Sequence, residues 1–242
     1  MNNHLEEILR QFIEDVSGVY GDAVLAVVLY GSAASDDYVR GKSNINCLIL
    51  LSEVTPQQLK KCSGYLGKWH DNGIATPLFI DPVYVNSSVD VFPIEFLDMK
   101  QRYRVLYGQD FLRDLQLQLT HLRFQCEQEL KGKMLRLRQL YIERTQSPQD
   151  LTRLLIRSLS SFMVLFRALL HLRKLPAPQS AEEILTGLSQ VQLRVDAMRK
   201  VYDLKRSDLT LTQSELNSLF ADYLSEIQAT IDSLEKMDVS AT

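Results

Sequence analysis

The sequence predicts an α+β protein, with a small sheet and its flanking helices followed by an all-α helical bundle. Residues 24–30 and 47–51 are continuous apolar runs of β-prone residues, which are typical of strands buried on both faces. Gly31-Ser32 ends the first of these strands in a turn. From Leu112 onward the sequence changes to long leucine-rich helical patterns with very few glycines. We therefore expect two domains, residues 1–111 and residues 112–242.

In the first domain, helix and strand signals alternate along the chain. Apolar residues at helical spacing from Leu5 to Val16 predict an amphipathic first helix, and a short helix is expected after the turn, over residues 33–39. Thr55-Pro56 and Asp81-Pro82 each place a capping side chain before a proline, which is a helix-start signal. Two more strands are expected, over residues 74–80 and 92–99.

The second domain reads as a bundle of amphipathic helices. A first helical region covers residues 112–145, and we expect an interruption near Gly132. Residues 151–175 are apolar on most sides, which predicts a helix at the centre of the bundle. Further helix starts are marked by capping patterns: Ser147-Pro148-x-Asp150, Ser180-x-x-Glu183 and Thr212-x-x-Glu215.

Composition and charge restrict the class of protein. The 242 residues, 45% of them apolar, can bury a sizeable core. The three cysteines are odd in number and unclustered, which argues against a disulfide framework or a zinc site. We see no signal peptide or membrane span and expect a soluble, cytoplasmic protein. The net charge of −3 makes nucleic-acid binding unexpected, although residues 112–175 carry 12 Lys or Arg against 5 Asp or Glu.

A motif at the turn adds a family resemblance. Gly31-Ser32, eleven intervening residues and then Asn44-Ile45-Asn46 before an apolar strand resemble the signature of the nucleotidyltransferase superfamily, which includes DNA polymerase beta-like and aminoglycoside nucleotidyltransferase-like proteins. The family pattern has acidic residues at both positions where this chain has Asn. The resemblance implies a small mixed sheet with helices, followed by a helical domain. It also matches Glu95 to the third acid of the family's site, on a neighbouring strand.

The resemblance implies transfer of a nucleoside monophosphate from a nucleoside triphosphate, with a divalent metal held by carboxylates. Residues i and i+2 of a strand project from the same face, so paired acids there bring two anionic ligands to one metal site. Asn44 and Asn46 keep this spacing but offer neutral amide oxygens, so we expect weak Mg²⁺ binding or none. Nucleotide contacts are expected from Gly31, Ser32, Lys42, Arg153 and Arg157.

Other residues near the turn leave alternatives open. Asp36 and Asp37 can substitute as metal ligands or serve as solvated or capping residues, and Arg40 can contact a nucleotide or cover the sheet edge. Arg153 and Arg157 lie four residues apart on an otherwise apolar helix, so at least one is expected to line a cleft or pair with an acid.

The preferred hypothesis is a catalytically degenerate nucleotidyltransferase-like protein, a pseudoenzyme that acts as a nucleotide-binding or protein-interaction module. One alternative is an active nucleotidyltransferase that transfers the nucleotide to a small molecule or a protein. The other is a partner in a toxin–antitoxin-like pair, or a homodimer formed through the helical domain.

Overall fold

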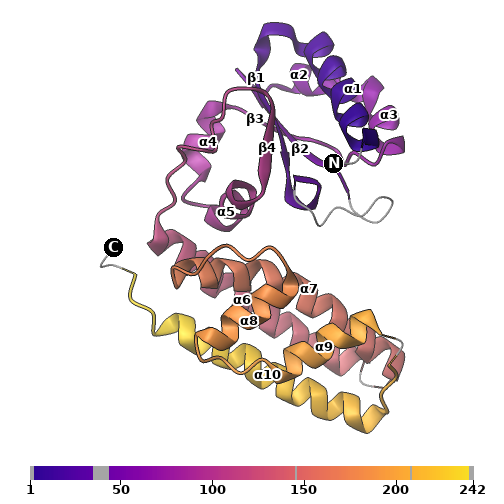
Figure 1. Cartoon of the computed structure of the whole chain (residues 1–242), viewed down its shortest axis with the longest axis vertical. Coiled ribbons are helices and arrows are strands. Elements are labelled where there is room, and N and C mark those ends of the chain that lie inside the picture. The colour runs from indigo at the N-terminus through magenta and orange to yellow at the C-terminus, as the bar shows by residue number, and fades with distance from the viewer. Residues whose placement is uncertain (1–2, 35–43, 145, 208, 240–242) are drawn as a thin grey trace. The chain divides into compact units, whose positions relative to one another are not determined.

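The computed structural model of the chain describes residues 3–34, 44–144, 146–207 and 209–239. The chain divides into two compact units, Met1–Leu117 and Gln118–Thr242 (Figure 1). The division falls after Leu117 rather than after residue 111. The reason is that Leu112 is fully buried in the core of the first unit, where Leu115 and Leu117 also pack.

The first unit is built on a mixed four-stranded sheet, as the resemblance predicts. Strand β1 runs antiparallel to both β2 and β4, whereas β2 and β3 are parallel, which gives the order β3-β2-β1-β4. The strands are β1 (Val24–Tyr30), β2 (Asn46–Leu51), β3 (Leu78–Ile80) and β4 (Tyr103–Gly108).

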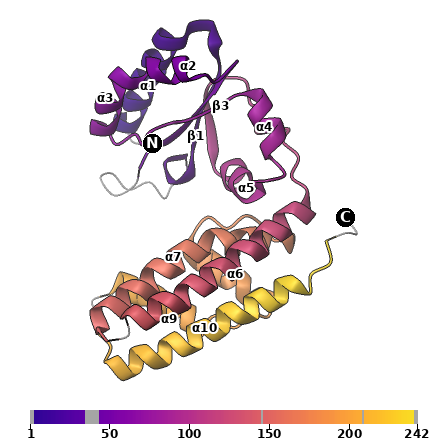
Figure 2. The same ribbon diagram turned by 180° about the vertical axis from the view of Figure 1, so that it is seen from behind.

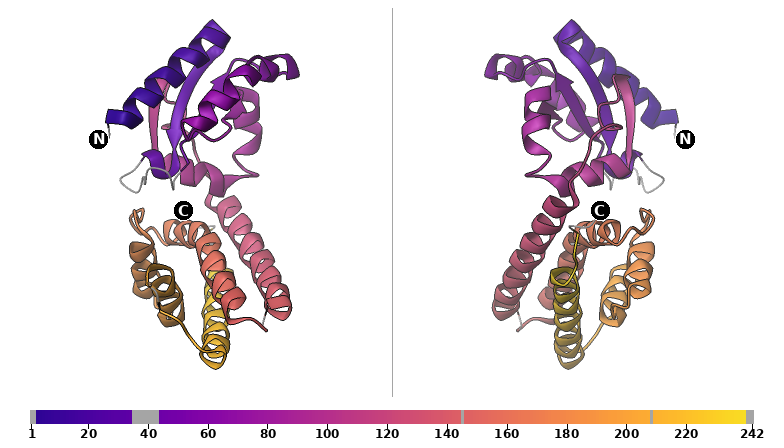
Figure 3. Two further views of the ribbon diagram at one scale, coloured as in Figure 1. Left: turned by 90° about the vertical axis from the view of Figure 1, so that its right-hand side faces the viewer. Right: turned by 90° about the vertical axis from the view of Figure 1, so that its left-hand side faces the viewer.

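Helices cover both faces of this sheet, and alternate residues of β1 and β2 point to opposite faces (Figures 1 and 3). Val27 and Ile49 belong to the core on the side of α1, whereas Val28 and Leu48 belong to the core on the side of α4 and α5. The prediction of strands buried on both faces is confirmed. The helices of this unit are α1 (Asn3–Tyr20), α2 (Pro56–Lys61), α3 (Leu66–Asp71), α4 (Pro82–Ser88) and α5 (Pro93–Gln101).

The prediction of a strand over residues 92–99 is wrong, because this segment forms α5 and the fourth strand is β4. Pro93 stands in the first turn of α5, where its missing N–H costs no hydrogen bond. Ile94, Phe96 and Leu97 are buried. A short apolar run of this kind does not distinguish a helix from a strand by its spacing.

The expected strand over residues 74–80 is also shorter than predicted. Ile74 forms an isolated parallel bridge with Ile45, and regular pairing begins only at Leu78. Pro77 precedes that strand and has no N–H to donate to a ladder. After the turn, a 3-10 helix covers Gly31–Ala34, and the rest of the predicted 33–39 helix lies outside the described residues.

The second unit is helical, and α7 lies at its centre as predicted, in contact with each of the other four named helices (Figure 2). The helix α6 runs without a break through Gly132, so the expected interruption there is wrong. All three predicted caps form, with the side chains of Ser147, Ser180 and Thr212 accepting backbone N–H groups. The helices are α6 (Leu119–Arg144), α7 (Pro148–Leu172), α8 (Ala181–Gln190), α9 (Asp196–Arg206) and α10 (Gln213–Glu235).

The start of α9 is stabilised by a residue from another helix. Val195 at its N-cap offers no side-chain acceptor, and the buried carboxylate of Glu226 on α10 instead accepts the N–H groups of Ala197 and Met198, each at 2.9 Å. Arg194 lies 3.6 Å from the same carboxylate. A buried acid thus satisfies the first amides of α9 and joins two helices.

Within the described part of the chain, α7 is the one helix long and apolar enough to cross a membrane by length and composition alone. Its most apolar stretch is 56% buried inside the protein, as in the core helix of a bundle.

Candidate functional site

The turn after β1 is held by its backbone. Gly31 has φ +75°, a left-handed conformation that favours glycine, and its N–H donates to the carbonyl oxygen of Arg102 at 3.0 Å. This bond ties the end of β1 to the residue that precedes β4. The Gly31 N–H is therefore used inside the fold and is not available to a phosphate, and Ser32 follows it in the 3-10 helix.

Asn46 is the first residue of β2 and pairs in register with Tyr30, the last residue of β1. Its side chain lies against the turn, since a Cβ added to Gly31 would come within 3.3 Å of Asn46 Nδ2. Asn44 is exposed, and Ile45 between the two is fully buried on the α1 side of the sheet. The alternation of a strand therefore directs Asn46 towards the side of α4 and α5.

Glu95 is not on a strand, unlike the third acid that the resemblance implies. It is exposed and lies in the first turn of α5. The match of Glu95 relied on the predicted strand over residues 92–99. Side chains on a helix point in other directions than side chains at the same positions of a strand.

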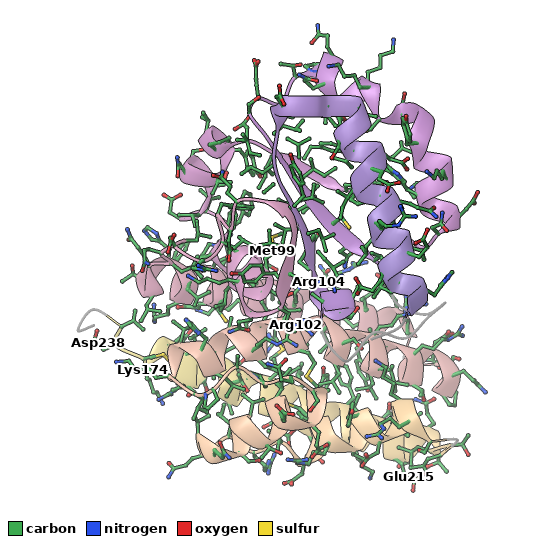
Figure 4. All side chains as sticks on the ribbon, turned by 45° about the horizontal axis from the view of Figure 1, so that its top comes forward. Met99, Arg102, Arg104, Lys174, Glu215 and Asp238 are labelled. Atoms are coloured by element: carbon green, nitrogen blue, oxygen red, sulfur yellow. The ribbon has the colours of Figure 1, made fainter. Side chains whose placement is uncertain are left out.

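Another acid of α5, Asp98, affects the pKa of Tyr30, the last residue of β1. Burial, and then the negative charges that Cys47 and Asp98 carry when ionised, raise the pKa of Tyr30. Asp98 Oδ1 lies 3.2 Å from Arg102 Nη2, and both side chains are largely buried. The carbonyl oxygen of Met99 accepts the Arg102 N–H at 3.2 Å, and both residues are labelled in Figure 4.

The Asp98–Arg102 pair was not predicted from the sequence. Its signal was the spacing of four residues between an acid and a base, which brings side chains together only on a helix. Assigning the segment to a strand hid that signal. A second arginine of this region, Arg104, pairs with Glu6 of α1 at 2.7 Å and is labelled nearby in Figure 4.

The residues present do not fit the metal that the resemblance implies. The two strand positions carry amides, Glu95 is exposed on a helix, and Asp98 is neutralised by Arg102. Across the described ranges, no three His, Cys, Asp or Glu side chains come together as a metal site. Lys42, Arg40, Asp36 and Asp37 lie outside the described residues.

In the helical unit, the two arginines singled out from the sequence separate. Arg153 is exposed and pairs with Asp150 at 2.6 Å. Arg157, one turn further along α7, lines a groove of about 300 Å³ between α6 and α7. The structure therefore brings Gly31 and Asn46 together in the first unit and places Arg157 in a separate groove of the second.

Comparison with known proteins returns little. No family model matches the chain, and no curated protein matches it. Among solved structures, it is similar to the spectinomycin adenyltransferase AAD(9) from Enterococcus faecialis, solved with ATP and spectinomycin, with a TM-score of 0.43 and 12% identity. The match covers 90% of this chain and 99% of that one.

Proposed function

We propose that the first unit is a nucleotide-binding module of nucleotidyltransferase type that does not catalyse metal-dependent transfer. The observation that carries this proposal is the position of the Asn46 amide, beside Gly31 at the end of paired strands β1 and β2. The motif resemblance puts a metal-binding carboxylate at this position. The proposal for nucleotide binding rests on the same resemblance at Gly31-Ser32.

The loss of transfer follows from charge. An amide oxygen ligates a hard cation only as a dipole, and its NH₂ group is repelled by the metal. Mg²⁺ gives up water reluctantly and needs anionic oxygens to hold it. Asp98 does not supply that charge in place of the two amides, because Arg102 already pairs with it.

The test restores the two carboxylates. Asn44→Asp/Asn46→Asp is nearly isosteric, so we expect the double variant to fold and to bind Mg²⁺ or Mn²⁺ at least about tenfold more tightly than the unmodified protein by calorimetry. Without metal, repulsion between the new acids lowers its melting temperature, and metal restores it. Asn86→Asp, which adds an acid on the exposed face of α4, is the matched control and leaves metal binding unchanged.

Nucleotide binding is measured separately on the unmodified protein. ATP at about 100 times its dissociation constant should stabilise the fold by about 2.7 kcal/mol, with or without Mg²⁺. A thermal shift that requires Mg²⁺, or transfer of nucleotide to an acceptor, would show an active enzyme instead. No shift with any of the common triphosphates would leave a protein-interaction module as the better description.

A further inference from the structure

The groove between α6 and α7 has an apolar floor and a basic rim. Leu137, Leu154 and Phe162 are buried along its floor, and Leu140 adds a half-buried wall. Its volume of about 300 Å³ is at the lower end of the range found for small-molecule sites. The basic side chains that line it are Lys133, Arg136, Arg144 and Arg157.

Helical spacing explains why these residues share one groove. On α6, the lining residues recur at intervals of three and four from Lys133 to Arg144, so they follow one line along the helix. The facing line on α7 includes Ser158 and Ser161, whose small side chains leave open the space that larger residues would fill. The groove therefore exists because α7 has small residues, Ser158 and Ser161, where it faces α6.

The charge around the groove is unbalanced. Lys133 Nζ lies 3.6 Å from Glu129 Oε2, and Arg136 Nη1 donates to the neutral side-chain oxygen of Gln139 at 3.4 Å. In the described part of the chain, no carboxylate lies within 4.0 Å of the Arg144 or Arg157 guanidinium, and no acid lines the groove. Among the described residues, three of the four basic side chains have no carboxylate within 4.0 Å, and such charges beside a low-dielectric floor concentrate a positive potential that attracts anions.

We propose that this groove binds a small organic phosphate with an apolar or aromatic body. Arg144 and Arg157, which both line the groove and have no carboxylate partner among the described residues, hold the phosphate, because a guanidinium binds phosphate oxygens in a bidentate manner. The body packs on Leu137, Leu140 and Phe162. This site lies within the helical unit and does not depend on nucleotide binding at Gly31.

The experiment uses the full chain and 1-naphthyl phosphate as the probe, titrated at low salt by calorimetry. We expect binding that weakens as salt is added, with 1-naphthol and inorganic phosphate each at least about tenfold weaker, because each lacks one half of the interaction. Arg144→Gln/Arg157→Gln should weaken the probe about tenfold or more. Ser161→Trp should block the groove without changing its charge.

The matched control is Arg138→Gln/Arg206→Gln, which removes two exposed charges of the same unit outside the groove. It should leave probe binding unchanged. If the control weakens probe binding as much as Arg144→Gln/Arg157→Gln does, the effect comes from the net charge of the protein and not from the groove. If Arg144→Gln/Arg157→Gln and Ser161→Trp both bind the probe as tightly as the unmodified protein, the probe binds elsewhere. If 1-naphthol binds as tightly as 1-naphthyl phosphate, the groove does not recognise the phosphate group and the proposal is wrong. If a short single-stranded oligonucleotide binds more tightly than the probe, the groove is part of a nucleic-acid-binding surface and not a small-molecule site.

Discussion

At the residue scale, the corner of the sheet beside Gly31 depends on which oxygen atoms face it. Asn46 offers an amide there, and Asp98 offers a carboxylate whose charge Arg102 offsets. Restoring a metal site therefore requires acids at the strand positions themselves. Removing Arg102 would instead take a positive charge away from a partly buried acid, which is a cost to the fold.

Two buried thiols give a prediction about alkaline pH. Burial raises the pKa of Cys47 and of Cys126 from 9.0 to about 12. Above about pH 9 the unfolded chain loses these protons while the folded chain keeps them. The contribution of the two thiols to the free energy of unfolding is therefore full below pH 9 and falls as the pH rises from about 9 to 12.

Urea unfolding measures this effect, at about pH 8 and about pH 10.5. Cys47→Ala/Cys126→Ala lowers stability at both values by making cavities, but it should lose less stability between them than the unmodified protein does. Tyrosine ionisation also lowers stability in this range in both proteins, and the loss of the Cys47 charge, which raises the pKa of Tyr30, changes that part in the variant. Identical losses would mean that the thiols ionise in the folded state as they do in the unfolded one.

At the element scale, two glycines with opposite surroundings test how β4 and α6 are built. Gly108 ends β4 with φ +77°, and a Cβ there would lie 2.0 Å from the carbonyl oxygen of Leu25. Gly132 lies inside α6, and a Cβ there would meet nothing within 4 Å. The first glycine permits a close strand contact, whereas the second only weakens a helix.

Gly108→Ala should therefore destabilise the protein by about 2 kcal/mol or more, because neither the backbone conformation nor the neighbouring strand accepts a side chain. Gly132→Ala should stabilise it by about 0.5–1 kcal/mol, because alanine loses less backbone entropy in a helix. Both changes are measured by chemical denaturation. A neutral result for Gly108→Ala would show that β4 can shift away from β1.

At the scale of the whole molecule, the two units have separate cores. Trp69, the single tryptophan of the chain, is buried in the first unit against Phe12, with 5.0 Å between ring centroids. Its fluorescence reports on that unit. Far-UV circular dichroism is dominated by the longest helices, α6, α7 and α10, which belong to the second.

Leu155→Ala, in the core of α7, should cost about 2–5 kcal/mol and lower the midpoint of the dichroism transition while leaving the Trp69 transition in place. Leu9→Ala, on the buried face of α1, should lower the midpoint of the Trp69 transition and leave the dichroism transition in place. Domains with their own cores unfold independently unless a large interface couples them. If both probes move together in each variant, the two units unfold as one.

Much of the architecture was predictable because it depends on neighbours along the chain. The periods of the α-helix and the β-strand explain several local patterns. These are the apolar runs of β1 and β2, the capping residues of α7, α8 and α10, and the apolar residues on most sides of α7. For the same reason, the turn at Gly31 is recognisable from the sequence alone. The spacing of Asn44 and Asn46 likewise needed only the alternation of a strand.

The tertiary structure decided two kinds of feature: contacts between residues far apart in sequence, and segments whose pattern suits a helix as well as a strand. The apolar run of α5 suits a helix as well as a strand, and only packing on the sheet selects the helix and leaves the next segment to form β4. The pairing of Asp98 with Arg102 depended on that choice. The capping of α9 by Glu226 joins segments about thirty residues apart, and the basic groove exists only where α6 meets α7. Local spacing specifies the elements, whereas contacts between elements determine which charges remain unpaired.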